Sequence, residues 1–191
     1  TPLPIEVIER VYDATEGIVV VDEAYWEFAP RDERSAITLL SDRERLVVSR
    51  TMSKAFAFAG ARVGYLAADP AVVDALRLVR LPYHLSALTQ AAAFAALQHA
   101  STMLATVDDI VAQRDRISAT LEALGYKPYE SWTNFVLFGG VDDPAATWQR
   151  LYERGVLVRD VGLARSLRVS AGTEDETSAF LDALASIDSA S

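Results

Sequence analysis

The fold of this chain is indicated most clearly by the stretch GIVVVDEAY at residues 17–25. Its β-branched run, IVVV at 18–21, is typical of a strand that is buried on both faces of a parallel sheet. The run ends at the polar segment DEAY, residues 22–25. A second apolar run, RLVVS at 45–49, ends in the same way at RTMSK, residues 50–54. The two patterns predict neighbouring strands that carry polar side chains at their carboxyl ends.

Helices and further strands are indicated along the rest of the chain. Apolar periodicity predicts helices at 4–14, 35–40, 71–80, 89–99, 107–124, 144–154 and 175–187. Short apolar runs predict strands at 62–67, 127–129, 135–138, 156–158 and 167–170. After Gly125 the pattern is typical of an α+β domain, in which helices cover one side of a sheet. We therefore expect an α/β part with a mostly parallel sheet at residues 1–105, followed by a small α+β domain at residues 106–191.

The composition argues against several classes of function. The 191 residues have a formal net charge of -9, whereas nucleic-acid binding needs clustered Lys and Arg, so no nucleic-acid partner is expected. No apolar stretch approaches the ~20 residues that cross a bilayer, so no membrane partner is expected. The absence of cysteine excludes disulfides and thiolate chemistry and fits the cytoplasm. His84 and His99 lie in different predicted elements, so no metal site is expected.

Six polar side chains at the predicted strand ends suit a single ligand. They belong to Asp22, Tyr25, Thr51, Ser53, Lys54 and Arg62. Ligands of open α/β sheets sit beyond the carboxyl ends of the strands, where these side chains are expected to converge. Taken singly, each has an ordinary explanation as a helix cap, a turn residue or a solvated surface group. Their joint occurrence favours pyridoxal phosphate (PLP), which needs a lysine for its Schiff base and an acid beside its pyridine nitrogen.

Three motifs resemble the signature of the fold-type I PLP-dependent aminotransferases. They are VDEAY at 21–25, TMSKAF at 51–56 and GARVGY at 60–65. The resemblance covers essentially the whole chain, but it corresponds only to the carboxyl-terminal half of such enzymes. It implies the last part of the PLP-binding large domain followed by the small domain. We therefore expect this chain alone to have little or no transaminase activity, because half of the site is missing.

The same resemblance implies a role for each of the six side chains. Lys54 would form the Schiff base with the cofactor and move protons, Asp22 would pair with the pyridinium, and Tyr25 would hydrogen-bond the ring hydroxyl. The groups assigned to the cofactor phosphate are those of Thr51, Ser53 and Arg62. Among them the forked guanidinium suits phosphate best, because it donates two parallel hydrogen bonds.

Substrate recognition is indicated by later passages. LRVSAGT at 167–173 resembles the family strand whose arginine, here Arg168, binds the substrate α-carboxylate. Similarity to the histidinol-phosphate aminotransferases is carried by residues 55–60, 81–86, 131–138 and 155–160. The last of these contains Arg159, which would face the substrate phosphate. The resemblance implies a homodimer in histidine biosynthesis that converts histidinol phosphate and 2-oxoglutarate to imidazole-acetol phosphate and glutamate, and back.

Other functions remain open on the sequence alone. Aminotransferases of aromatic amino acids, and PLP decarboxylases of phosphorylated threonine, share much of the pattern. An alternative of another class is a binding or regulatory module that kept the fold but lost catalysis. The joint presence of Lys54, Asp22, Tyr25 and Arg62 argues against that alternative.

Overall fold

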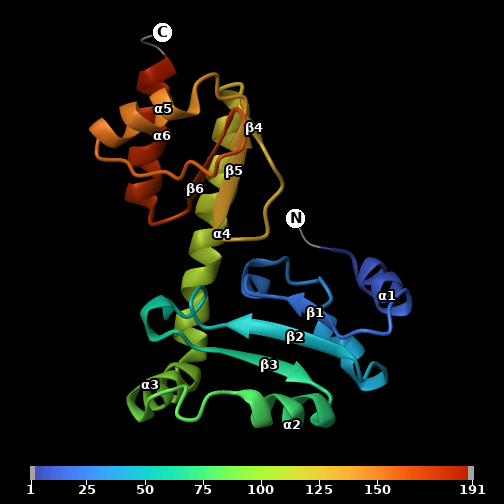
Figure 1. Ribbon diagram of the computed structural model, residues 1–191. Coiled ribbons are helices and arrows are strands. Elements are labelled where there is room, and N and C mark those ends of the chain that lie inside the picture. Colours follow the sequence, from blue (N-terminus) through green and yellow to red (C-terminus); the bar gives the residue numbers. More distant parts are fainter. Residues whose placement is uncertain (1–2, 189–191) are drawn as a thin grey trace. The chain divides into compact units, whose positions relative to one another are not determined.

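The computed structural model describes residues 3–188, and the chain divides into two compact units, Thr1–Ala105 and Thr106–Ser191 (Figure 1). Each unit has its own three-stranded sheet, ordered β1-β2-β3 in the first and β4-β5-β6 in the second. The division falls within helix α4 (Ala100–Ala123). Within residues 3–188, the helices are all too short or too polar to cross a membrane.

The first sheet combines one parallel and one antiparallel pairing. Its strands are β1 (Val19–Asp22), β2 (Leu46–Thr51) and β3 (Gly64–Ala68). β1 runs parallel to β2 and places Asp22 opposite Ser49, whereas β3 runs antiparallel to β2. The expected predominance of parallel pairing is therefore not seen in these three strands. The reason is that residues 52–63 form a loop with one short 3-10 turn, not the crossover helix that a parallel return requires.

The predicted helices of the first unit are formed, that at 35–40 as a 3-10 helix, and two further 3-10 turns, η1 and η3, were not predicted. In the first unit they are α1 (Ile5–Asp13), η1 (Trp26–Phe28), η2 (Ala36–Asp42), η3 (Ala59–Ala61), α2 (Pro70–Val79) and α3 (Ala87–Gln98). The carboxylate of Asp69 accepts a hydrogen bond from the amide of Ala71 and so caps α2, and Ser86 caps α3 by accepting from Thr89. These caps satisfy amide groups that the first turn of a helix leaves without partners.

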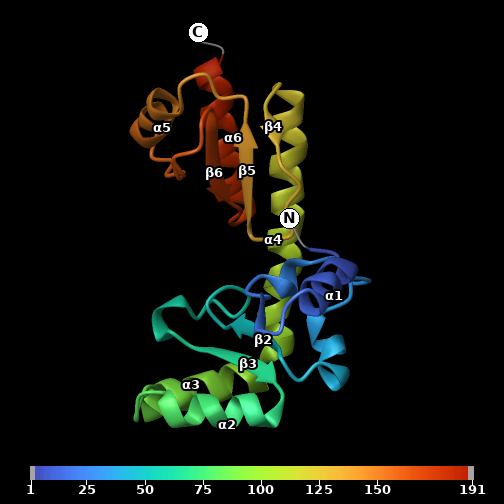
Figure 2. The same ribbon diagram turned by 45° about the vertical axis from the view of Figure 1, so that its right-hand side comes forward.

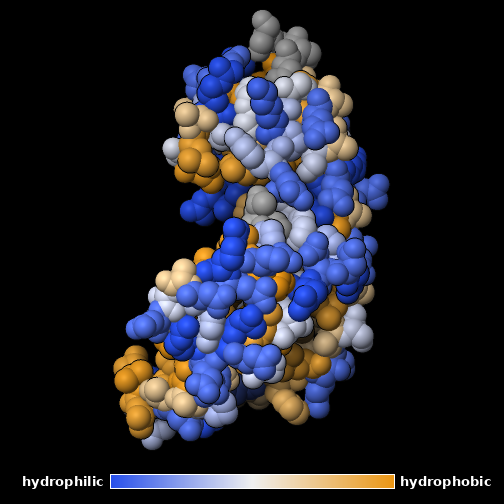
Figure 3. All heavy atoms as spheres, turned by 90° about the vertical axis from the view of Figure 1, so that its right-hand side faces the viewer, coloured by the Kyte–Doolittle hydropathy of each residue, from blue (hydrophilic) through white to orange (hydrophobic). Residues whose placement is uncertain are grey.

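Only one face of β1 is covered. Val19 and Val21 pack against a core that contains Ile8, Leu39 and Leu46. Val20, which points to the other face, is 62% exposed, so β1 is buried on one face only in this half-length chain. Figure 3 also shows apolar side chains gathered at the surface over α2 and α3. The most exposed large hydrophobic residues in this part of the chain are Leu78, Val79, Leu81, Tyr83 and Leu88.

The second unit is an antiparallel sheet with helices packed on one face (Figure 2). Its elements after α4 are β4 (Lys127–Pro128), β5 (Phe135–Gly139), α5 (Pro144–Glu153), β6 (Ser166–Ser170) and α6 (Glu174–Asp188). Alternate residues of β5 and β6, such as Phe138 and Leu167, face a core shared with Ile117, Leu151 and Leu184 of the three helices. This is the α+β arrangement that the sequence predicts.

One predicted strand is not formed. Residues 156–158 make no ladder, and the segment contributes a single isolated antiparallel bridge between Arg159 and Arg168. Gly155, at a φ of +77°, turns the chain after α5, and Val156 and Val158 anchor the segment to the core. Apolar burial alone therefore explains the pattern that had suggested a strand.

Candidate active site

Asp22 is fixed at the end of β1 by its neighbours. Its Oδ1 accepts hydrogen bonds from the amide of Ala24, at 3.1 Å, and from the hydroxyl of Ser49, at 3.2 Å. Ser49 is the register partner of Asp22 on β2, so both side chains lie on the same face of the sheet. The carboxylate is exposed, and it can therefore accept a further hydrogen bond from a ligand.

Lys54 and Tyr25 are brought together by the loops that follow β1 and β2. The Nζ atom of Lys54 lies 5.5 Å from the centroid of the Tyr25 ring, within the range of a cation–π contact. Lys54 is exposed, but its neighbours Met52 and Ala55 are 2% and 6% exposed. The amine is thus presented to solvent from a backbone that is anchored on both sides.

The loop between β2 and β3 is closed by hydrogen bonds between its two ends. The hydroxyl of Thr51 accepts from the amide of Ser53 at 3.1 Å and donates to the carbonyl of Val63 at 3.3 Å. The amide of Met52 also donates to Val63. Gly64 completes the closure, because a Cβ there would lie 2.7 Å from the carbonyl oxygen of Arg50. The hydroxyl of Thr51 and the backbone of Ser53 are thereby held at the carboxyl end of β2.

Arg62 has an unusual backbone conformation. Its φ of 55° and ψ of 44° place it in the left-handed region, which few residues other than glycine adopt. The side chain is exposed and donates from Nη1 to the carbonyl of Ala59 at 3.0 Å. Strained conformations of this kind often occur at ligand clamps. Because β3 is antiparallel to β2, Arg62 precedes β3 at the same end of the sheet as Thr51.

These side chains fit a cofactor that carries an aldehyde, a ring nitrogen and a phosphate. The fit rests on an exposed amine on an anchored loop at Lys54 and on a carboxylate oriented by two donors at Asp22. Hydroxyl and guanidinium donors lie at the same end of the sheet, as phosphate requires. The structure thus places all six predicted residues around the carboxyl ends of β1 and β2. Their individual roles stay a prediction.

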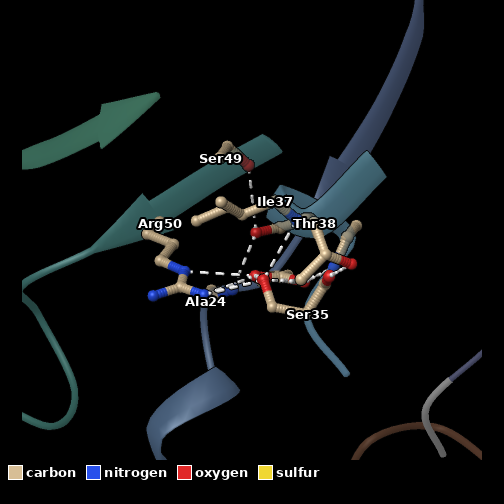
Figure 4. Close-up of polar contacts among 9 residues, drawn as sticks. Ala24, Ser35, Ile37, Thr38, Ser49 and Arg50 are labelled. Carbon is tan, nitrogen blue, oxygen red and sulfur yellow. Dashed lines mark hydrogen bonds and ion pairs between the residues drawn. The ribbon is translucent and has the colours of Figure 1, made fainter. Parts of the chain in front are cut away.

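A buried ion pair behind these residues was missed by sequence reasoning. Glu23, 8% exposed, accepts hydrogen bonds through Oε2 from Nε and Nη2 of Arg50, at 3.1 and 2.8 Å (Figure 4). Its Oε1 accepts from the amide of Ala36 at 2.7 Å. The hydroxyl of Ser35 donates to Glu23 and accepts from Arg50 at 2.9 Å. The sequence does place an acid directly after Asp22 and a base directly before Thr51. These opposite charges indicate an ion pair only when the register of β1 on β2 is known.

Arg50 of this pair and the nearby Glu27 have shifted pKa values. Burial lowers the pKa of Arg50, but hydrogen bonds to Glu23 and Tyr65 and the charge of Glu23 outweigh burial and raise it above its ordinary value. Burial raises the pKa of Glu27, and the charge of Glu23 acts in the same direction. A backbone hydrogen bond and the charge of Arg50 only partly offset this rise. The Oε2 of Glu27 is buried without a hydrogen-bond partner among the described residues.

The two predicted substrate residues of the second unit form a pair of their own. Arg159 and Arg168 exchange both backbone hydrogen bonds, at 2.8 and 2.9 Å, so their side chains lie on the same face of the sheet. The guanidinium carbon of Arg168 lies 4.6 Å from the Phe135 ring centroid, and its Nε is buried without a hydrogen-bond partner within residues 3–188. Two cations directly opposite each other repel, and a bound anion would relieve this repulsion.

Comparison with known proteins places the chain among aminotransferases. The model of the family "Aminotransferase class I and II" matches residues 2–184. The histidinol-phosphate aminotransferase of Paenarthrobacter aurescens is 60% identical over 187 residues, which are 96% of this chain and 50% of that protein. The corresponding enzyme of Mycolicibacterium smegmatis is 57% identical over 95% of this chain and 48% of its own length. The chain therefore spans about half the length of these relatives.

A solved structure gives the same result. The histidinol-phosphate aminotransferase of Sinorhizobium meliloti, in complex with pyridoxal-5'-phosphate, superposes with a TM-score of 0.84 at 32% identity. The similarity covers 99% of this chain and 54% of that one. The expected family resemblance and fold are thereby confirmed.

Proposed function

This chain belongs to the class I and II aminotransferase family, and from that premise we propose that the protein containing it is a PLP-dependent transaminase. Its reaction would convert histidinol phosphate and 2-oxoglutarate to imidazole-acetol phosphate and glutamate, and back, as a step of histidine biosynthesis. Support comes from the 57–60% identity to histidinol-phosphate aminotransferases. The observation that carries the proposal is the exposed amine of Lys54 beside the Tyr25 ring.

The residues of the first unit would hold PLP. The Lys54 amine would bind it covalently, the Asp22 carboxylate would keep the pyridine nitrogen protonated, and the Tyr25 phenol would hydrogen-bond the ring hydroxyl. The phosphate would be bound by Thr51, Ser53 and Arg62. When bound, PLP acts as an electron sink for the negative charge that forms on the substrate carbon carrying the amine. The Nζ of Lys54 would take the proton from that carbon.

The arginines of the second unit would bind the two substrates. Arg168 would hold the α-carboxylate of glutamate, which histidinol phosphate lacks, and Arg159 would favour the phosphate of histidinol phosphate. Both proposals rest on the placement of the two guanidinium-bearing residues on one sheet face. A cationic pair favours a phosphate-bearing substrate over an aromatic amino acid, so rates with a panel of amino donors would test this assignment.

The remaining proposals concern domains and assembly. The first unit would be the carboxyl-terminal part of the PLP-binding large domain, and the second unit the small domain. The whole protein would work as a homodimer in the cytoplasm. Exposed apolar side chains at Leu81, Tyr83 and Leu88 support association, because monomers seldom expose such groups together. The chain by itself would have little or no activity, because it spans about half of its relatives.

Lys54 has one internal comparison in this chain, because the 191 residues contain only two lysines, Lys54 and Lys127. PLP is added to the full-length protein, the covalent link is reduced with borohydride, and the peptides are analysed by mass spectrometry. We expect the adduct on Lys54. Lys54→Ala should abolish it and lower the rate by at least about 10²–10⁴-fold, since the base is lost with the attachment point.

Lys127→Ala is the matched control, because Lys127 is also exposed but lies in the second unit. It should keep both the adduct and the rate. An adduct on any other lysine with none on Lys54, or a Lys54→Ala variant of normal activity, would contradict the proposal.

A further inference from the structure

The sheet separates two pairs of polar residues at the ends of β1 and β2. Asp22 and Ser49 are register partners and hydrogen-bond each other on one face. The next residues along the two strands, Glu23 and Arg50, point to the opposite face and form the buried ion pair. Asp22 and Ser49 therefore lie on the face of the candidate site, and Glu23 and Arg50 form their pair on the opposite face.

The side chains of this pair form several hydrogen bonds with each other and with neighbouring segments. Both oxygens of Glu23 accept hydrogen bonds, from Arg50 and from the Ser35–Ala36 segment. The Ser35 hydroxyl also accepts from the amide of Ile37, so it joins the pair to the start of η2 (Figure 4). Arg50 lies 5.7 Å from the ring centroid of Trp26, in the turn directly after Tyr25. The pair thus joins four segments: β1, the turn after it, η2 and β2.

Stability alone is a weak reason for such an arrangement. A buried ion pair often contributes no more than well-packed apolar residues of the same size, because desolvation of the charges offsets their attraction. What the pair adds is direction, since each hydrogen bond fixes both a distance and an angle. The positions it fixes are those of Asp22, Tyr25 and Thr51, which are its neighbours in the chain.

We infer that Glu23 and Arg50 are positioning residues, which hold the ends of β1 and β2 so that Asp22 and the Thr51–Lys54 segment meet the cofactor in the right orientation. This inference rests on the proposed PLP chemistry. Neither residue touches the candidate site itself, and both act through the backbone. The pair should therefore govern cofactor affinity and the protonation of the bound cofactor.

The test uses the full-length protein and three variants. Glu23→Gln removes the negative charge of the pair, and Arg50→Lys keeps the positive charge but removes the forked guanidinium group. Ser35→Ala is a milder change, to be used if either of these variants fails to fold. Measured quantities are the thermal midpoint, the PLP dissociation constant from absorption titration, and the pH midpoint of the bound-cofactor spectrum. We expect PLP affinity to fall about 10- to 100-fold, as when partners that orient a bound group are removed elsewhere, and the pH midpoint to move.

Glu9→Gln is the matched control. Glu9 pairs with Arg43 in the same unit, and its Oε1 lies 2.8 Å from Nη2 of Arg43, but neither residue adjoins the site. This variant should change the thermal midpoint only. If folded Glu23→Gln, Arg50→Lys and Ser35→Ala proteins keep the wild-type PLP affinity and pH midpoint, the inference is overturned. If the control loses as much affinity at equal destabilisation, it is overturned as well.

The failure of the proposed function gives a different result. In that case the wild-type protein forms no adduct on Lys54, and the inference falls with it. If the wild type forms the adduct while the variants behave as the wild type does, only the positioning role is lost.

Discussion

The two sheets hold their candidate site residues in different ways. In the first sheet, Lys54 follows a strand end, and a polar pair, Glu23 and Arg50, lies behind it. In the second sheet, Arg168 lies in the middle of β6, and its neighbours Leu167 and Val169 face an apolar core. Apolar burial is non-directional, whereas hydrogen bonds fix angles. The first arrangement therefore controls orientation, and the second mainly supplies stability.

The largest effect on stability should come from the core of the second sheet. Phe138 is fully buried there. Phe138→Ala removes its apolar contacts and leaves a cavity, so we expect the free energy of unfolding to fall by about 4 kcal/mol. Urea unfolding of the chain, followed by circular dichroism, measures this change. Phe94→Ala is the control, because Phe94 is 65% exposed, and should stay within about 0.5 kcal/mol. If both variants lost the same free energy of unfolding, burial of Phe138 in the second sheet would not explain the stability that we assign to that core.

A smaller loss is expected from the polar pair of the first sheet. Arg50→Met should lower the free energy of unfolding by about 3 kcal/mol, because it leaves the buried Glu23 carboxylate without its counter-charge. The double variant Glu23→Leu/Arg50→Met should cost much less than the sum of the two single changes, as for residues in one network. A double-mutant cycle by urea unfolding checks this. Simple additivity would show that the two residues do not act as a pair.

The smallest effect is expected at Glu27. Its pKa is raised in the folded state, so the folded protein keeps the proton longer than the unfolded chain does, and stability falls as pH rises through that interval. Glu27→Gln should therefore be more stable than wild type at neutral pH, by less than about 1 kcal/mol, and the difference should vanish below about pH 4. Thermal midpoints across pH measure this. The exposed Glu33→Gln controls for loss of one charge. A difference that grows toward low pH would contradict the assignment.

Much of the local structure could be predicted because it depends on neighbours in the chain. Pro70 after Asp69 starts α2 where expected, and the short apolar run at 135–138 marks β5. The exceptions depend on contacts between distant segments. The direction of β3 follows from the loop at 52–63, and the partial exposure of Val20 follows from what covers β1. Local patterns carry no information on either.

The candidate site shows the same division. Lys54, Asp22 and Tyr25 were selected because their chemical types and spacing suit one cofactor. Glu23 lies in the VDEAY motif and Arg50 directly precedes TMSKAF, but neither received a role, because charged side chains are ordinarily solvated. Only the register of β1 on β2 shows that they meet and are buried.

The sequence by itself determined the family, the positions of the helices and most strands, and the residues that suit a PLP site, since these depend on residue type and short-range order. The tertiary structure decided which residues become neighbours: Lys54 beside the Tyr25 ring, Arg159 beside Arg168, and Glu23 on Arg50. The physical reason is that burial and hydrogen bonding between distant segments depend on strand register and packing, which are properties of the folded chain as a whole.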